Sequence, residues 1–224
     1  NYGVVFNYDN PKEVLATGGG DISITGTAGA NYGVFFQNTD VLASGGTLTV
    51  NGGTLGITAA AGGVRLASRT STSITSSSAN VVLTGNAINF SGASTVNTTG
   101  TVTVQPFGNN FSSTLSWPVS NLTLANTVSG LTIGKDIGTT AHTDTVTIGS
   151  NTTIAGPINV YAGTINVNAN LNTTSAGAAG DVLLKASGNI TQGSGVDVTT
   201  NGGNVTYWAD SDANSQGNIY LTQG

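Results

Sequence analysis

The sequence contains no cysteine and no methionine, one histidine, and only 10 acidic and 5 basic residues among 224. Without cysteine, the chain has neither disulfide bonds nor thiolate metal sites. Five basic residues are too few to follow a phosphate backbone, so we expect no nucleic-acid binding. No apolar run approaches the ~18 residues of a spanning helix, so we expect no membrane span. One Glu and three Lys also leave little support for helices.

Small and polar residues are abundant instead. Gly, Thr, Asn and Ser together make up 115 of the 224 residues. Such a composition occurs in flexible tracts, but 38% of this chain is hydrophobic, and those residues are regularly placed. Short β-branched runs between Gly and Asn clusters predict strands.

Two segments near the N-terminus occur twice. NYGVVF at 1–6 returns as NYGVFF at 31–36, and VLATGG at 14–19 returns as VLASGG at 41–46. The first repeat is offset by 30 residues and the second by 27, because the link between them shortens from seven residues to four. Strand-like parts that persist while their link changes length predict a solenoid, in which coils stack and insertions bulge outward.

A shorter motif runs through the whole chain: Gly, then Asp, Thr or Asn, then a triplet of apolar, any and apolar residues. Because strand side chains alternate between faces, both apolar residues of a triplet point the same way. Strands this short are unstable alone and need the matching strand of the next coil. The motif begins at Gly20, Gly46, Gly53, Gly100, Gly163, Gly180, Gly203 and Gly217, and similar triplets occupy 122–124, 131–133, 146–148 and 158–160.

These patterns predict an all-β parallel β-solenoid that spans residues 1–224 as one unit. With roughly 20 to 25 residues per coil, it would have about nine to eleven coils. Residues 105–121, which contain two Pro and a Trp, are expected to loop outward or to change the shape of a coil. An antiparallel sandwich or barrel is the alternative, since Gly-Gly and Asn-Gly pairs also suit hairpin turns.

The C-terminal half resembles the repeats of filamentous-haemagglutinin-like adhesins, which are very large bacterial surface exoproteins. The resemblance covers roughly residues 120–224 and rests on GLTIGK (130–135), IAGPINVY (154–161), DVLLKASGNIT (181–191) and NGGNVTYWADSD (201–212). It implies a right-handed parallel β-helix that is exported and is extracellular or displayed on a cell surface. It also implies that the chain is an internal portion of a longer repetitive protein.

Candidate residues for chemistry are few. His142 is two residues from Asp144, so it could be a general base oriented by a carboxylate. No nucleophile can be named for it, however, and we expect His142 to be an exposed loop residue. Asp210, Asp212 and Asn214 place oxygen ligands at alternate positions, like the opening of a calcium loop. The glycine and the bidentate glutamate of that motif are absent. Calcium is the one candidate metal and the one candidate cofactor that the sequence offers.

Some β-helices are polysaccharide lyases or hydrolases, which need carboxylates and basic residues in one groove. Arg65 and Arg69 lie in a stretch without acidic residues. Asp197, which could pair with a carboxylate of 210–212 for glycoside hydrolysis, has no basic residue closer in sequence than Lys185. We therefore expect that the chain is not an enzyme.

The expected function is structural and adhesive: a segment of a secreted adhesin or extracellular filament that can self-associate end to end or side by side. Tyr161, Tyr207, Trp208 and Tyr220 are expected to be exposed, where they could stack on surface glycans or on host or neighbouring-cell proteins. Carbohydrate binding by the solenoid is thus one alternative. Ice binding is the other, and it would need Thr-x-Thr on successive coils; Thr47/Thr49, Thr101/Thr103 and Thr145/Thr147 fit, whereas other triplets do not.

Overall fold

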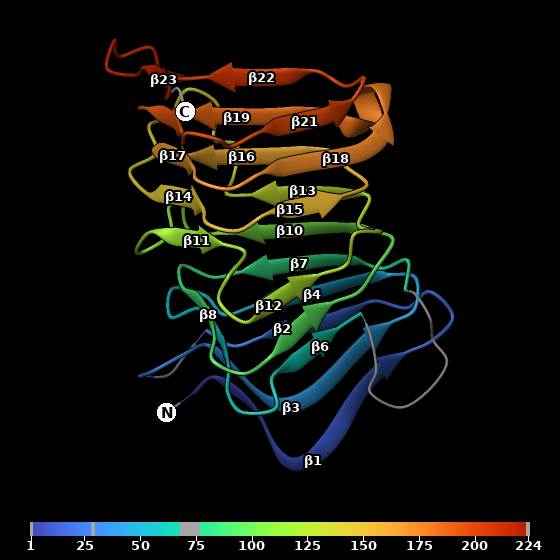
Figure 1. Cartoon of the computed structure of the whole chain (residues 1–224). Helices are drawn as coiled ribbons and strands as arrows, with labels where there is room; N and C mark the ends of the chain where they lie inside the picture. The colour runs from blue at the N-terminus through green and yellow to red at the C-terminus, as the bar shows by residue number, and fades with distance from the viewer. Residues whose placement is uncertain (1, 28–29, 68–76, 223–224) are drawn as a thin grey trace.

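The protein is a parallel β-solenoid (Figure 1). The computed structural model describes residues 2–27, 30–67 and 77–222. Every pair of adjacent strands in this part of the chain is parallel. The strands stack from the N-terminus at the lower end of Figure 1 to the C-terminus at the upper end. This arrangement confirms the solenoid and excludes the antiparallel sandwich.

One sheet runs the length of the rod and takes one strand from each coil. It has eight strands, so the rod has eight coils and not nine to eleven. We call it the long sheet. Its strands are β2 (Ile22–Thr25), β4 (Thr47–Asn51), β7 (Asn80–Thr84), β10 (Thr101–Gln105), β13 (Gly130–Ile133), β16 (Ile158–Ala162), β19 (Val182–Ala186) and β22 (Val205–Trp208).

The coil count is lower because the coils are longer than expected. Residues that pair in register from strand to strand mark where each coil starts on the long sheet. They are Ile22, Leu48, Val81, Val102, Leu131, Ile158, Val182 and Val205. Successive members of this series are 21 to 33 residues apart in the sequence.

Three further sheets close the other sides of the rod. In the N-terminal half, a seven-stranded sheet contains β1 (Val4–Ala16), β3 (Val34–Ala43), β5 (Ile57–Ala59), β6 (Val64–Leu66), β8 (Ile88–Phe90), β9 (Ser94–Val96) and β12 (Leu122–Leu124). In the C-terminal half, a five-stranded sheet contains β11 (Leu115–Trp117), β14 (Thr145–Ile148), β17 (Thr164–Val167), β20 (Ile190–Gln192) and β23 (Ile219–Leu221). A three-stranded sheet contains β15 (Thr152–Ile154), β18 (Leu171–Ala176) and β21 (Val198–Asn201), with a short 3-10 turn, η1 (Gly177–Gly180), after β18.

The N-terminal sequence repeat is the pairing register of β1 with β3. Val4 pairs with Val34 and Val14 with Val41, which reproduces the offsets of 30 and 27 residues. The register shifts after Asn7, so an irregularity in β1 absorbs the three extra residues of the longer link. Stacked coils therefore tolerate a change of length where the chain leaves the ladder.

The core fills the inside of the rod, because the first and third residues of each triplet point inward. Leu48, Val81 and Val102 on neighbouring strands of the long sheet are fully buried, and each such side chain contributes roughly 1.5–3 kcal/mol of burial free energy. At the last coil the same inward positions are exposed: Val205 is 40% and Leu221 65% accessible. Among the described residues, no further coil covers them.

The stretch 105–121, expected to loop outward or to change the shape of a coil, joins strands of two different sheets. Gln105 still belongs to β10, and residues 106–114 form no strand. The chain then re-enters the ladder as β11, in which Leu115 and Trp117 pair with β14 and are buried. The apolar side chains of Leu115 and Trp117 explain this return, because they fill the inward positions of the coil.

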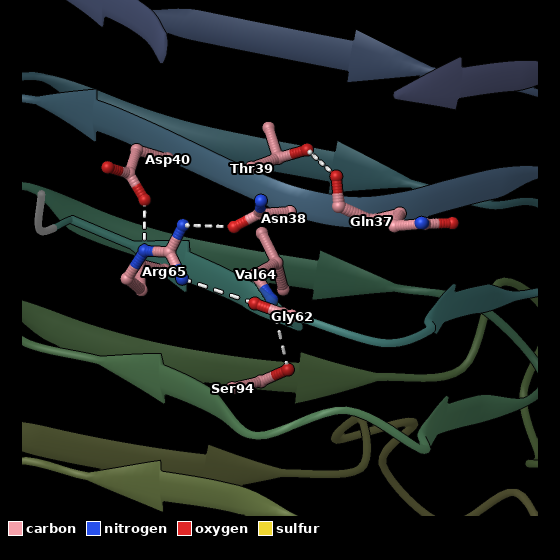
Figure 2. Close-up of polar contacts among 8 residues, drawn as sticks. All are labelled: Gln37, Asn38, Thr39, Asp40, Gly62, Val64, Arg65 and Ser94. Carbon is pink, nitrogen blue, oxygen red and sulfur yellow. Dashed lines mark hydrogen bonds and ion pairs between the residues drawn. The ribbon is translucent and has the colours of Figure 1, made fainter. Parts of the chain in front are cut away.

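The arginine of β6 has an acidic neighbour after all. Arg65 pairs in register with Asp40 on β3, 25 residues earlier. Its guanidinium donates to the carboxylate of Asp40, to the side-chain oxygen of Asn38 and to the carbonyl of Gly62 (Figure 2). Asp40 is buried and Arg65 only partly exposed, so the group is a structural ion pair between coils. Arg69 lies outside the described residues.

Candidate functional site

Polar and charged side chains gather at one corner of the rod, where the chain passes from the long sheet to the five-stranded sheet. Besides the connection 106–114 of the preceding coil, four segments from successive coils meet there: 134–144, 163, 187–189 and 209–218. The first and the last are long loops, whereas the two between them are tight turns. We call this region the polar corner.

A cavity of about 220 Å³ lies between the two long loops. It forms because two adjacent coils turn tightly while the coils on either side bulge outward. The tight turns provide Gly163, Ser187 and Gly188, and the loops provide the polar walls. The wall residues include His142, Thr143, Asp212, Asn214 and Gln216.

The first loop is tied down on the tight turns. The backbone N–H of His142 donates to Ser187 Oγ at 2.7 Å. The Asp144 carboxylate accepts from the N–H groups of Gly163 at 3.2 Å and Phe111 at 3.0 Å. A Cβ at Gly163 would lie 2.7 Å from the carbonyl oxygens of both His142 and Asp144. Only glycine therefore lets the loop lie this close to the corner.

His142 is buried, with 9% of its surface accessible, so the expectation of an exposed loop residue is wrong. The loop folds back over the coils and takes the imidazole with it. Nδ1 of His142 lies 3.8 Å from an oxygen of Asp144, too far for a hydrogen bond. Nδ1 is buried and has no hydrogen-bond partner. Asp144 thus does not orient His142 as it would in a general-base pair.

The residues predicted to bind calcium lie in the second loop. Most of their side-chain oxygens form hydrogen bonds with other groups of the same loop. The carboxylate of Asp210 accepts from the N–H groups of Ser215 and Gln216 at 3.2 and 3.4 Å. Asn214 accepts from the N–H of Gln216 at 2.8 Å and donates to Asp212 Oδ2 at 2.8 Å. The other oxygen, Asp212 Oδ1, is buried without a partner. Within the described residues, no group of three or more His, Cys, Asp or Glu side chains is arranged to hold a metal ion.

The outer face of the long sheet carries an aromatic and charged column beside this cavity. Tyr161, Lys185 and Trp208 pair in register on β16, β19 and β22. Nζ of Lys185 lies 2.8 Å from an oxygen of Asp136 and 4.7 Å from the centre of the Trp208 ring. Trp208 remains 49% accessible, so the cation holds the indole in place while one part of it faces solvent.

Two ionisation equilibria reflect this arrangement. The hydrogen bond from Lys185 holds the pKa of Asp136 below its ordinary value, and the N–H of Gly138 acts in the same direction. Burial raises the pKa of Tyr161, and the negative charge of Asp136 raises it further. The charges of Lys185 and Asp136 therefore affect the ionisation of neighbouring groups, including Tyr161.

Of the four aromatic residues expected to be exposed, two are. Trp208 and Tyr220 are each 49% accessible. Tyr161 is partly buried, and Tyr207 occupies an inward position in register with Leu184. The hydroxyl of Tyr207 donates to the Gln192 side chain. Tyr207 therefore closes the end of the core and offers no outer stacking surface.

The threonine pairs do not form a continuous array on the described strands. Thr47/Thr49 on β4 and Thr101/Thr103 on β10 are separated by β7, which carries Asn80 and Val82 in the same register. Thr145/Thr147 lies on β14, in the five-stranded sheet. Asp197 precedes β21 and lies at another corner of the coil from the loop 209–218, so the structure does not bring it to Asp210 or Asp212.

Sequence reasoning did not find the polar corner as a unit. It missed Asp136, Lys185 as its partner, and Ser187. A usable signal exists, because the segment that precedes each strand of the five-stranded sheet must fall at the same corner of successive coils. Aligning the chain on the triplets at 146–148 and 165–167 and on Ile190 brings these segments together.

The fold and this corner define a β-solenoid with a polar cavity and an exposed aromatic side chain on its flank. In comparisons with protein-family models, with curated proteins and with solved structures, nothing matches this chain. Within the described residues, no helix has the length and apolar character to cross a membrane.

Proposed function

We propose that this chain is a structural and adhesive segment of a secreted or cell-surface rod, such as a filamentous-haemagglutinin-like adhesin, and that it does not catalyse a reaction. The long sheet carries the proposal, because its eight strands continue without interruption while the other sheets change along the rod. A single uninterrupted ladder keeps outer side chains at fixed spacings over many coils. Such a scaffold suits display and attachment better than turnover.

The outer surface supports adhesion as well. Inward positions are filled by apolar residues, so the outward ones are free to vary between threonine, asparagine and aromatic residues at little cost to folding. Trp208 and Tyr220 are exposed aromatic residues of the kind that binding surfaces use. The resemblance of residues 120–224 to adhesin repeats agrees with this function.

Attachment of protein-coated beads to cells tests the proposal. Beads that carry the folded chain are expected to attach to bacterial or epithelial cells more often than beads that carry an Ile158→Asp variant. Ile158 is fully buried on the long sheet, and a carboxylate there costs several kcal/mol, so the variant controls for non-specific attachment by an unfolded chain. Equal attachment of both bead populations to every cell type would refute the adhesive role.

A further inference from the structure

We propose that the cavity of the polar corner binds one neutral hexose unit of a glycan, with Trp208 stacking against the adjoining sugar. This inference rests on the proposed adhesive function and names the ligand class for it. The cavity of about 220 Å³ is many times larger than the ~10–15 Å³ of cavity volume that a single water molecule needs. It has room for a six-membered ring with its hydroxyl groups.

The lining matches a ligand that both donates and accepts hydrogen bonds. Thr143, Ser187, Asn214 and Gln216 offer hydroxyl and amide groups that do either. Sugar hydroxyl groups have the same double capacity. An apolar ligand would leave this lining unsatisfied.

Two lining residues have buried polar atoms without a partner. These atoms are His142 Nδ1 and Asp212 Oδ1, and they come from the two opposite loops of the cavity. A buried polar atom left unpaired costs roughly 1–3 kcal/mol. Because both atoms are covered, each side chain has to turn toward the cavity before a ligand hydroxyl can bond it. A hydroxyl that then donates to Asp212, or forms a hydrogen bond with His142, recovers part of that cost. Each of the two loops therefore contributes a lining residue whose hydrogen-bonding capacity is not fully used within the protein.

The charges around the cavity favour a neutral sugar over an acidic one. Asp212 lines it, and the carboxylate of Asp144 lies 3.8 Å from the ring of His142. The nearest lysine in the cluster, Lys185, is already paired with Asp136 and is 8% accessible. Among the described residues that line the cavity there is one carboxylate, Asp212, and no lysine or arginine, so a sulfated or uronic-acid unit would meet a like charge there.

Trp208 belongs to the same corner as the cavity. After Trp208 the chain is tied to the segment that follows Lys185, because Asp210 N donates to the carbonyl of Gly188 at 3.4 Å and Ser211 N to that of Ala186 at 3.0 Å. Lys185 fixes the indole from one side. A sugar ring presents a C–H face that stacks on such an aromatic surface, so a glycan held in the cavity can extend onto Trp208.

Binding to immobilised glycans tests the inference. The probes are the neutral polysaccharides mannan, galactan and amylose, with heparin and polygalacturonate as acidic counterparts, each with and without a chelator. The chain is expected to bind at least one neutral glycan equally with and without the chelator. Trp208→Ala and Asp212→Ala are each expected to weaken that binding about tenfold, which corresponds to ~1.4 kcal/mol.

The matched control is Tyr2→Ala, because Tyr2 is also an exposed aromatic residue, 38% accessible, and lies just before β1 in the first coil, far along the rod from the polar corner. This variant is expected to bind like the original chain, and the unfolding midpoint of each variant is measured alongside. Binding to acidic glycans only, binding only in the presence of calcium, or equal loss in Trp208→Ala and Tyr2→Ala would each overturn the inference. If Trp208→Ala and Asp212→Ala bind every neutral glycan as the original chain does while beads coated with them still attach to cells, the site is refuted and the adhesive function stands. Glycan binding without any cell attachment refutes the function and not the site.

Discussion

Replacing Gly163 by alanine probes the packing that creates the polar corner. Gly163 is the single residue between β16 and β17, and the loop 134–144 lies directly on it. A Cβ there would stand 2.7 Å from two carbonyl oxygens and 3.0 Å from a carbonyl carbon, all in the backbone of His142 and Asp144. Backbone atoms cannot swing aside as the end of a long side chain can, so the loop as a whole must move.

The size of the effect follows from those distances. Contacts of a Cβ with heavy atoms are normally 3.4 Å or longer, so the loop must retreat by roughly 0.7 Å, an overpacking that typically costs about 1–3 kcal/mol. For a chain of this length, each kcal/mol lowers the melting temperature by roughly 2–4 °C. We therefore expect Gly163→Ala to melt about 4–8 °C lower at a cost near 2 kcal/mol.

Gly149 provides the matched control. It stands outside the strands, and a Cβ there would meet nothing closer than 4.0 Å. Gly149→Ala is expected to leave stability unchanged or to raise it by roughly 0.4–1 kcal/mol, because alanine restricts the unfolded chain. Circular dichroism melts compare the two variants with the original chain.

Hydrogen exchange adds a local measurement, because coils of a solenoid can open separately. The N–H of Thr164 donates to the carbonyl of Asp144 at 3.0 Å, and in Gly163→Ala it should exchange faster than in the original chain. Exchange on the far strands of the long sheet should stay the same. If Gly163→Ala melts at the same temperature as Gly149→Ala and protects Thr164 equally well, the loop does not lie on the corner and the reasoning is wrong.

Three further predictions concern the core, the ion pair and pH. Val160→Ala, at a fully buried position, should cost about 2 kcal/mol, whereas Val205→Ala, 40% accessible, should cost less than about half of that in the same urea titration. Arg65→Met should lower the unfolding free energy by about 2 kcal/mol, because it removes three donated hydrogen bonds, including one to Asp40. A loss no larger than that of an exposed residue would contradict the structural role of the Asp40–Arg65 pair. The lowered pKa of Asp136 adds stability that is present above its ordinary value of 3.8 and is lost as the pH falls through the lowered value. Asp136→Asn should therefore flatten the acid limb of the stability curve, and an unchanged limb would show that the contact with Lys185 is weak in solution.

Most of the strands follow directly from the triplet motif. The segments that begin at Gly20, Gly46, Gly100 and Gly163 all form strands at the expected positions. The exception is the segment at Gly53, where Gly53 and Gly56 take positive φ and the strand starts only at Ile57. Apolar alternation in a triplet identifies which residues can face a core, but a glycine inside it allows a turn instead.

Coil length is harder to predict, and the number of coils depends on it. The triplets repeat, whereas the connections from the long sheet to the five-stranded sheet range from one residue at Gly163 to eleven in the loop 134–144. Burial does not constrain a connection that lies outside the core. The sequence therefore specifies which residues face the core more tightly than it specifies where one coil ends.

The same freedom explains why the Asp40–Arg65 pair could not be predicted from neighbouring residues. In a solenoid, the residue in register on the next coil is 21 to 33 positions away along the long sheet and 25 positions away for this pair. A search for charge partners within ten residues misses nearly all of the contacts between coils. Partner assignments become possible only when the coils are aligned on their inward triplets.

The unequal length of the connections also locates the candidate binding site. A rod with identical coils would have smooth corners, because each turn would cover the one below it. Here two tight turns, at Gly163 and at 187–189, lie between two loops of ten or more residues, so a cavity is left that no single coil could form. Packing in the core restricts the inward residues, and the hydrogen bonds between stacked strands keep the outer faces flat. Connections of changing length are the part of this fold in which a pocket can arise without loss of the core, and the polar corner has one.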